Sequence, residues 1–267
     1  MLINPLNRES LAEALSGSNP FPFVVIDGFL QDEFAREVAE AYPSFRRALE
    51  EGFSFNYVNE RLKVQMTDSH RFPEPIRWLN EALASPDFLA DLEAITGVQS
   101  LLADEELVGG GMHLTGPGGR LDVHVDFNYV KERKLHRRLN LLLYLNPVWE
   151  ESWGGCVELW DREVKCCQHS FAPILNRCLI FETSDISYHS AAPVTCPPSV
   201  SRKSFATYYY TEEPPPGWDG KSHSTIFRAR PEERFRGYVL MPLERFQRRL
   251  RAGIRGARRE LKRWIVG

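Results

Sequence analysis

The sequence predicts a mainly β protein of the jelly-roll type with flanking helices. Short apolar runs separated by Gly, Pro and Asp turns fill the middle of the chain, which is typical of an antiparallel sandwich or barrel. The segments on either side of this region space their apolar residues by three or four, as helices do. With 267 residues, of which 43% are hydrophobic and 26% charged, the chain is long enough to bury a sizeable core.

We expect one domain with additions rather than separate folding units. The first 97 residues should supply an entry strand and supporting helices, and residues 98–212 the β core. Residues 213–267 should form an extension, because the run Pro214-Pro215-Pro216-Gly217 interrupts any regular element.

The N-terminal elements follow from apolar spacing and from cap and breaker residues. Phe21 to Ile26 forms a β-rich run that ends at Asp27-Gly28. A helix that begins near Asp32 should end before Pro43, because proline removes a backbone donor. The expected elements are helices over 8–16, 32–42, 73–83 and 86–95, a strand over 21–26, and one or two strands within 53–66.

The β core is expected to consist of short strands in quick succession. Such strands can direct side chains from different positions in the chain toward one point inside a barrel. The expected strands cover residues 112–115, 121–126, 139–145, 157–160, 179–181 and 205–210.

The extension carries an amphipathic pattern over 243–265, with arginine and lysine on its polar face. The favoured interpretation is a helix whose apolar stripe packs on the barrel. The same pattern also allows a helix that lies on an anionic membrane or contacts nucleic acid or an acidic protein.

The remaining composition indicates a cytoplasmic protein. The formal net charge is −3, and no apolar run approaches the length of a membrane span. The N-terminus lacks the pattern of a secretory signal, and five cysteines without framework spacing argue against a disulfide scaffold.

His124, Asp126 and His189 are the candidate metal ligands. His124 and Asp126 are two residues apart, so on a strand their side chains share one face and can reach one ion. His189 closely follows an apolar strand that ends at Phe181. Two imidazoles and one carboxylate on one face of a metal, with the other face open, are typical of non-haem iron(II) oxygenases.

The chain resembles the iron(II)- and 2-oxoglutarate-dependent dioxygenases, specifically their prolyl 4-hydroxylase-like branch. The resemblance covers roughly residues 105–211, and residues 22–30 resemble the entry strand of that branch. Its motifs are GGRLDVHVDF at 118–127, LLLYLN at 141–146, WGG at 153–155, His189, and RKS at 202–204. The resemblance implies a double-stranded β-helix, the cupin-like form of the jelly roll.

The resemblance also implies cofactors and a reaction class. Iron(II) would be bound by His124, Asp126 and His189, with 2-oxoglutarate and dioxygen at its open positions and ascorbate as an optional accessory reductant. The family couples decarboxylation of 2-oxoglutarate to succinate with oxidation of a second substrate. Family halogenases lack the carboxylate ligand, so Asp126 favours hydroxylation of an unactivated C–H bond.

The cosubstrate site is expected around Arg202. A guanidinium can bind the far carboxylate of 2-oxoglutarate through two parallel hydrogen bonds, and Ser204 points the same way on a strand. The resemblance places Tyr144 against that carboxylate and Asn140 beside it. A family tyrosine on the preceding strand is absent, and His113 or Thr115 lies near its place.

The substrate is less well defined by the sequence. The basic loop 128–138 should border the mouth, which suggests Asn128 and Arg138 as substrate contacts, and Trp153 and Trp160 could form a lip. The substrate would be a peptidyl residue such as proline, or a small molecule.

Two other functions remain open. One is a cupin-like metal enzyme, such as an isomerase, that does not use 2-oxoglutarate. The other is a non-catalytic module that binds a membrane or nucleic acid through its basic helix. A buried arginine facing the open side of the metal would argue against the first, and salt-sensitive binding that survives loss of the metal ligands would favour the second.

Overall fold

The computed structural model describes residues 2–233 and 235–243, and it confirms the mainly β architecture. One antiparallel sheet runs in the order β1-β10-β7-β12-β5-β11-β8-β9, with β2, β3, β4, β6 and β13 added beside this path. The strands are β1 Phe23–Asp27, β2 Phe53–Phe55, β3 Glu60–Met66, β4 Leu102–Ala103, β5 Gly111–Val125, β6 Tyr129–Val130, β7 Leu135–Tyr144, β8 Val157–Trp160, β9 Cys167–Phe171, β10 Arg177–Glu182, β11 His189–Ala191, β12 Arg202–Thr211 and β13 Ile226–Arg228.

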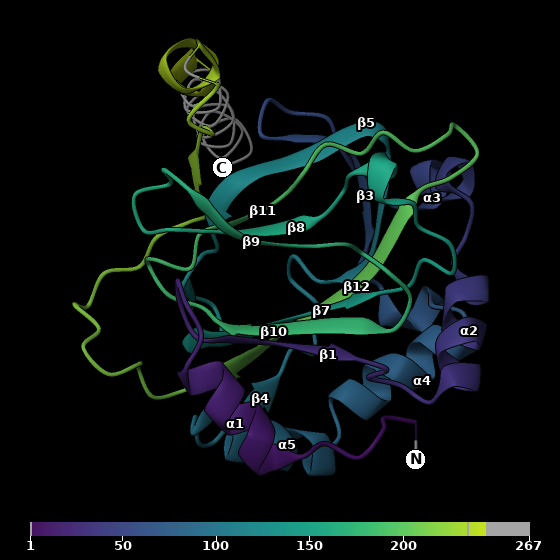
Figure 1. Cartoon of the computed structure of the whole chain (residues 1–267). Coiled ribbons are helices and arrows are strands. Elements are labelled where there is room, and N and C mark those ends of the chain that lie inside the picture. Colours follow the sequence, from purple (N-terminus) through teal and green to yellow (C-terminus); the bar gives the residue numbers. More distant parts are fainter. Residues whose placement is uncertain (1, 234, 244–267) are drawn as a thin grey trace, which may run out of the picture.

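The sheet curls into two facing layers, the arrangement of a jelly roll. In Figure 1, β5, β11, β8 and β9 lie above the layer of β1, β10 and β7, and α1, α4 and α5 lie beneath that lower layer. The helices are α1 Arg8–Ser16, α2 Asp32–Ala41, α3 Phe45–Glu51, α4 Glu74–Leu83 and α5 Pro86–Thr96, with short turns η1 Ser69–Arg71, η2 Glu151–Trp153 and η3 Arg236–Leu240.

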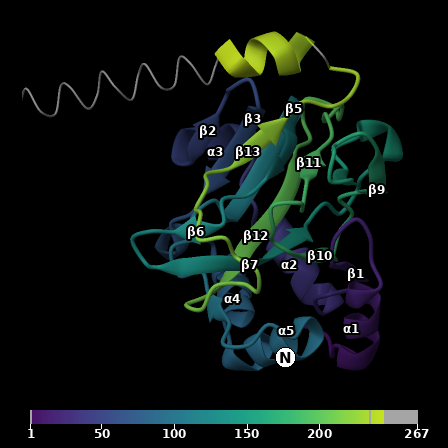
Figure 2. The same ribbon diagram turned by 90° about the vertical axis from the view of Figure 1, so that its left-hand side faces the viewer.

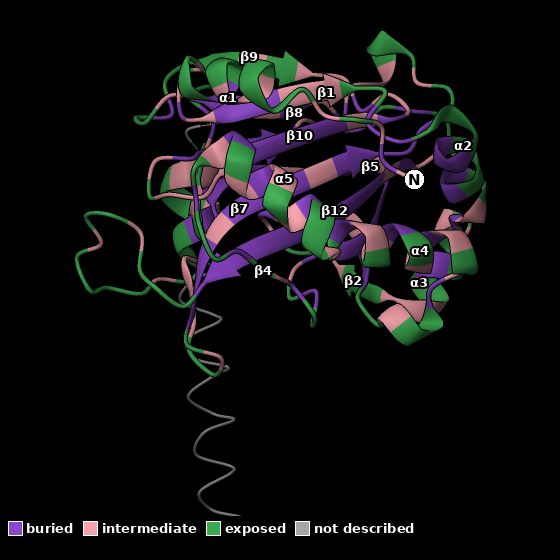
Figure 3. Ribbon diagram, turned by 90° about the horizontal axis from the view of Figure 1, so that it is seen from below, coloured by how far each residue is buried: buried purple, intermediate pink, exposed green. Residues whose placement is uncertain are grey.

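Alternation along β7 separates the helix-facing core from the interior of the barrel. Leu139, Leu141 and Leu143 belong to the core cluster that the helices cover. Asn140 and Tyr144 face the other way, into the barrel. Figure 3 shows the result from below: the helices expose their outer faces and cover strands that are mostly buried.

The expected N-terminal helices are confirmed, and their ends follow the capping residues. Ser85 accepts a hydrogen bond from the Phe88 backbone at the start of α5, and Gly97 ends α5 with φ of 72°. The elements that were not expected are α3, the strands β4, β6, β9, β11 and β13, and the short segments η1, η2 and η3. The N-terminal strands join the same sheet, since β1 pairs with β10 and β3 pairs with β5.

The prediction of two strands at 112–115 and 121–126 was wrong, because β5 is continuous from Gly111 to Val125. Gly116 and Gly119, which were expected to form a turn, permit close packing within the strand. A Cβ on Gly116 would lie 2.7 Å from the Phe45 ring, and one on Gly119 would lie 2.4 Å from a Thr115 methyl group. The prediction assigned these glycines to a turn. They lie instead within one irregular strand, where the missing side chains allow the close approaches.

The extension returns to the barrel through β13, which pairs with the Val123–Val125 end of β5. Figure 2 shows this segment running alongside β5. Most of the basic helix expected over 243–265 lies outside the described residues. None of the helices in residues 2–233 and 235–243 has the length and apolar composition needed to cross a membrane.

Candidate active site

His124, Asp126 and His189 converge on one point inside the barrel. One ligand atom from each lies within 4.8 Å of the others, and all three residues are buried. His124 Nε2 is 3.6 Å from one Asp126 carboxylate oxygen, and His189 Nε2 is 3.7 Å from the other. The convergence arises because β11 pairs with β5 with His189 directly opposite His124.

Backbone carbonyls hold both imidazoles in the tautomer that a metal requires. His124 Nδ1 is 2.9 Å from the Asp122 carbonyl, and His189 Nδ1 is 2.9 Å from the Ser187 carbonyl. A carbonyl can only accept, so each Nδ1 donates and each Nε2 offers a lone pair to the centre. Burial lowers the pKa of both imidazoles, that of His189 to about 4, so both are neutral near pH 7.

Asp126 is kept ionised by its neighbours. Burial alone would raise the pKa of its carboxyl group, but the Arg137 guanidinium and then the two imidazoles lower it well below the usual range. The Arg137 Nη1 atom lies 3.1 Å from Asp126 Oδ2, and the Asn140 amide donates to the same oxygen at 3.0 Å. Two neutral imidazoles and one carboxylate are a donor set that suits iron(II).

Arg137 lines the cavity, whereas the predicted substrate contact Arg138 does not. Between β7 and β12, Tyr209 pairs with Leu139 but the next residue, Tyr210, pairs with Arg137, so Arg138 is the extra residue of a β-bulge. Arg137 thereby turns into the cavity, where its guanidinium lies 3.8 Å from the Phe127 ring centre and 3.6 Å from that of Tyr208. Arg138 instead donates to the Thr211 hydroxyl and does not line the cavity.

A cavity of about 700 Å³ opens beside the triad and is lined by a band of polar side chains. The band crosses three neighbouring strands, since Ser204 on β12 pairs with His113 on β5 and with Tyr144 on β7. Arg202, two residues before Ser204, extends the same face and pairs with Thr115. The predicted cosubstrate residues therefore lie side by side in one wall of the cavity.

Arg202 and Tyr144 suit a carboxylate. Arg202 is buried, its Nε donates to the Gly155 carbonyl at 2.6 Å, and its guanidinium lies 4.9 Å from the Tyr144 ring centre. The Tyr144 hydroxyl is fully buried, and no atom of residues 2–233 and 235–243 lies where it could form a hydrogen bond of normal geometry with it. Burial, opposed by Arg202, raises the pKa of Tyr144 to about 12, so the hydroxyl remains a donor. A buried cation and an unsatisfied donor fit the far carboxylate of 2-oxoglutarate.

His113, one of the two residues near the place of the missing family tyrosine, lies beside Ser204 in the pairing of β12 with β5. Its side chain lines the cavity, and its buried Nε2 has no hydrogen-bond partner in the described part of the chain. Burial, followed by the charges of Lys63 and Arg202, lowers the pKa of His113 well below its ordinary value. A neutral imidazole therefore faces the cavity next to the predicted cosubstrate residues.

The other predicted substrate residues do not line the cavity. Trp160 is buried and donates to the Ser190 hydroxyl, and Trp153 packs edge-on against Trp149. The Asn128 side chain forms hydrogen bonds with the backbone of Lys221 and His223, so it supports a segment of the cavity wall.

The extension supplies part of the cavity wall, which was not predicted from the sequence. Ser222 to Thr225 line the cavity, and the Phe227 ring lies 5.4 Å from the His124 ring. His223 also pairs with Asp185 at 2.9 Å. These contacts join segments nearly forty residues or more apart, so no local pattern could have predicted them.

Comparison with known proteins links this site to one family. Residues 110–210 match the sequence model of the 2OG-Fe(II) oxygenase superfamily. Over 78 residues the chain is 32% identical to mouse prolyl 3-hydroxylase OGFOD1, a match that covers 28% of this chain and 14% of that protein. The chain thus spans only a small part of this curated relative.

Two solved structures share the fold. A Pseudomonas putida prolyl-4-hydroxylase superposes with a TM-score of 0.53 at 17% identity, over 74% of this chain and 97% of that one. A Trichoplax adhaerens prolyl hydroxylase, solved with a peptide fragment of the hypoxia inducible factor oxygen degradation domain, gives 0.54 at 19% identity, over 77% and 91%. These similarities confirm the double-stranded β-helix.

Proposed function

We propose that this chain, whose residues 110–210 match the sequence model of the 2OG-Fe(II) oxygenase superfamily, is an iron(II)- and 2-oxoglutarate-dependent dioxygenase that hydroxylates an unactivated C–H bond. One observation carries the proposal: three converging metal-ligand atoms share a cavity with the buried guanidinium of Arg202. Asp126 supports hydroxylation rather than halogenation, because a halide would need the position of that carboxylate.

When bound, iron(II), 2-oxoglutarate and dioxygen would together supply the oxidation: the conversion of 2-oxoglutarate to succinate and carbon dioxide would place one oxygen atom in succinate and the other in the C–H bond of the substrate. The residues of this chain prepare that chemistry. His124 and His189 present fixed Nε2 atoms, and Asp126 remains ionised beside Arg137. Arg202 binds the far carboxylate, and Tyr144 donates to it.

Leu142 and Val157 contribute apolar lining to the same cavity. Apolar walls limit the water around the reacting groups and strengthen the charge–dipole contacts of the bound carboxylate. The Arg202 guanidinium has no evident purpose in a cupin-like isomerase or in a purely binding module, so we favour the dioxygenase over both.

For the substrate we propose a peptidyl residue, with proline as the first candidate. The similarity to a prolyl 3-hydroxylase and to prolyl hydroxylase structures supports this choice. A cavity of about 700 Å³ also has room for a compact small molecule, which is the alternative. Cytoplasmic location and the role of the basic C-terminal segment stay predictions.

The test separates cosubstrate chemistry from substrate choice. Anaerobic addition of 2-oxoglutarate to the iron(II)-loaded protein should produce a visible absorption band, and oxygen should then yield succinate. The D126A and H124A variants should lose both signals, whereas H70A, which alters an exposed histidine, should keep them. Absence of the band and of succinate in the unmodified protein would refute the dioxygenase.

Mass spectrometry then decides the substrate class. Proline-containing peptides should gain one oxygen atom in an iron- and 2-oxoglutarate-dependent manner. If peptides remain unchanged while small molecules gain oxygen, the peptidyl proposal is wrong and the dioxygenase proposal stands.

A further inference from the structure

Arg230 is a buried arginine of the extension, outside the region that matches the family. Its side chain is 6% exposed and lies just after β13. Two of its nitrogens contact Glu158 on β8, at 3.2 Å from Nε and 2.8 Å from Nη2. A second group of contacts reaches the strands that hold the metal ligands.

Those contacts place Arg230 between β5 and β11. Its Nη2 donates to the Ser190 hydroxyl at 3.2 Å and to the Ala191 carbonyl at 3.4 Å, and its Nη1 lies 3.7 Å from Asp122. Ser190 directly follows His189, and Asp122 precedes His124 by two residues. One guanidinium therefore contacts both strands that carry histidine ligands.

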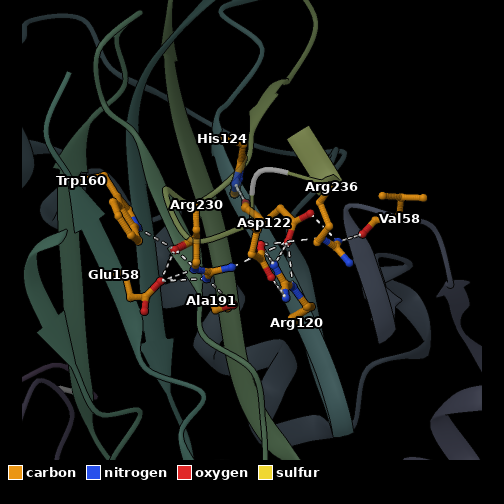
Figure 4. A network of polar contacts seen from close by, with 11 residues as sticks. Val58, Arg120, Asp122, His124, Glu158, Trp160, Ala191, Arg230 and Arg236 are labelled. Carbon is orange, nitrogen blue, oxygen red and sulfur yellow. Dashed lines mark hydrogen bonds and ion pairs between the residues drawn. The ribbon is translucent and has the colours of Figure 1, made fainter. Parts of the chain in front are cut away.

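Asp122 connects this contact to a ligand directly. Its side chain is 1% exposed and also pairs with Arg120 and, at 2.8 Å, with Arg236. Its backbone carbonyl accepts the hydrogen bond from His124 Nδ1. Figure 4 shows the whole cluster, with Arg230 between Glu158 and Asp122 and His124 above them.

We propose that Arg230 is a positioning residue of the metal centre: it fixes the spacing of β5 and β11, and through them the orientation of His124 and His189. This inference rests on the proposed function, because it assumes that the triad binds a metal. The planar guanidinium suits the task, since it donates hydrogen bonds to the Glu158 carboxylate and the Ser190 hydroxyl in fixed directions while its Nη1 lies 3.7 Å from the Asp122 carboxylate.

The test measures metal binding rather than turnover. Purified protein is titrated with cobalt(II) alone while its visible d–d absorption is recorded, and circular dichroism and thermal unfolding report the fold. In R230M the cobalt dissociation constant should rise about tenfold, as for other residues that orient ligands from outside the coordination sphere, and the d–d band should change shape. R230K should restore part of the affinity.

R177M is the matched control. Arg177 also joins two strands through a paired carboxylate, bonding Asp27 at 2.6 and 2.8 Å, but neither β1 nor β10 carries a ligand. It should lower stability without changing the cobalt band. Equal cobalt affinity and equal spectra in R230M and the unmodified protein would overturn the inference.

The outcomes also distinguish a failure of this inference from a failure of the proposed function on which it rests. If the unmodified protein binds no cobalt, or if H124A binds it equally well, the metal assignment itself fails. If R230M does not fold, E158Q supplies the comparison, because it weakens the opposite end of the same contact and keeps the arginine. E158Q should then weaken cobalt binding severalfold, and an unchanged affinity would refute the inference.

Discussion

Replacing Arg137 with methionine should destabilise the metal-free protein far more than the same change at the neighbouring Arg138. Arg137 is 2% exposed and pairs with Asp126, which would then remain buried with the Asn140 amide as its hydrogen-bond donor. Methionine keeps part of the aliphatic stem but removes the guanidinium, and with it both the ion pair with Asp126 and the contact with the Phe127 ring.

The expected loss follows from the cost of an uncompensated buried charge. Breaking a buried ion pair by removing one partner costs about 3–5 kcal/mol. In a domain of this size each kcal/mol corresponds to roughly 2–4 °C, so R137M should unfold roughly 6–20 °C lower at neutral pH. R138M removes a half-buried arginine bonded to a hydroxyl and should cost about 1 kcal/mol.

The deficit of R137M should depend on pH. Without the guanidinium, burial should outweigh the remaining influence of the imidazoles and raise the folded-state pKa of Asp126, and ionising this carboxyl group would then oppose folding at every pH above the unfolded value of about 4. That penalty is relieved as pH falls through the raised pKa, so the difference from the unmodified protein should narrow on acidification. Cobalt(II) should also narrow it, because the bound cation replaces the missing charge.

Thermal unfolding of both variants, with and without cobalt and between pH 7 and 5, provides the measurement. Equal unfolding temperatures for R137M and R138M would refute the reasoning, as would a deficit that neither acid nor cobalt reduces.

Four further predictions use the same structure. R202M should weaken 2-oxoglutarate binding to the cobalt-loaded protein by roughly thirtyfold or more, since truncating one partner of a buried charge pair costs about 2–5 kcal/mol; a change below threefold in calorimetry would contradict this. H113L should weaken the same binding by about threefold to tenfold, the worth of one hydrogen bond, and leave cobalt affinity unchanged. Cobalt affinity should fall by less than tenfold from pH 8 to 6, because burial lowers the pKa of both imidazole ligands, that of His189 to about 4, and so limits competition by protons in this range; a tenfold loss between pH 7 and 6 would count against it. N176A should lower the free energy of unfolding by about 2–4 kcal/mol in urea titrations, because the Asn176 side chain makes two hydrogen bonds to the Leu30 backbone and the Asn176 backbone has a φ of 63°. A loss under 0.5 kcal/mol would show those hydrogen bonds to be unimportant.

The sequence alone predicted the fold class and the His124–Asp126 pair because both depend on short-range periodicity. Side chains two residues apart on a strand share a face, so His124 and Asp126 could be paired without a structure. Apolar spacing and cap residues likewise located α1, α2, α4 and α5. The position of His189 followed from the resemblance, and the strand pairing confirms that it lies opposite His124.

Only the tertiary structure decided which arginine enters the site. A count by twos from Asn140 points Arg138 inward, but one extra residue in the pairing of β7 with β12 reverses the faces and brings in Arg137. The same holds for Arg230, which meets Glu158 and Asp122 across 72 and 108 positions of the sequence. Strand register and distant ion pairs depend on how whole strands pack together, and the free energy of that packing cannot be derived from a short stretch of the sequence.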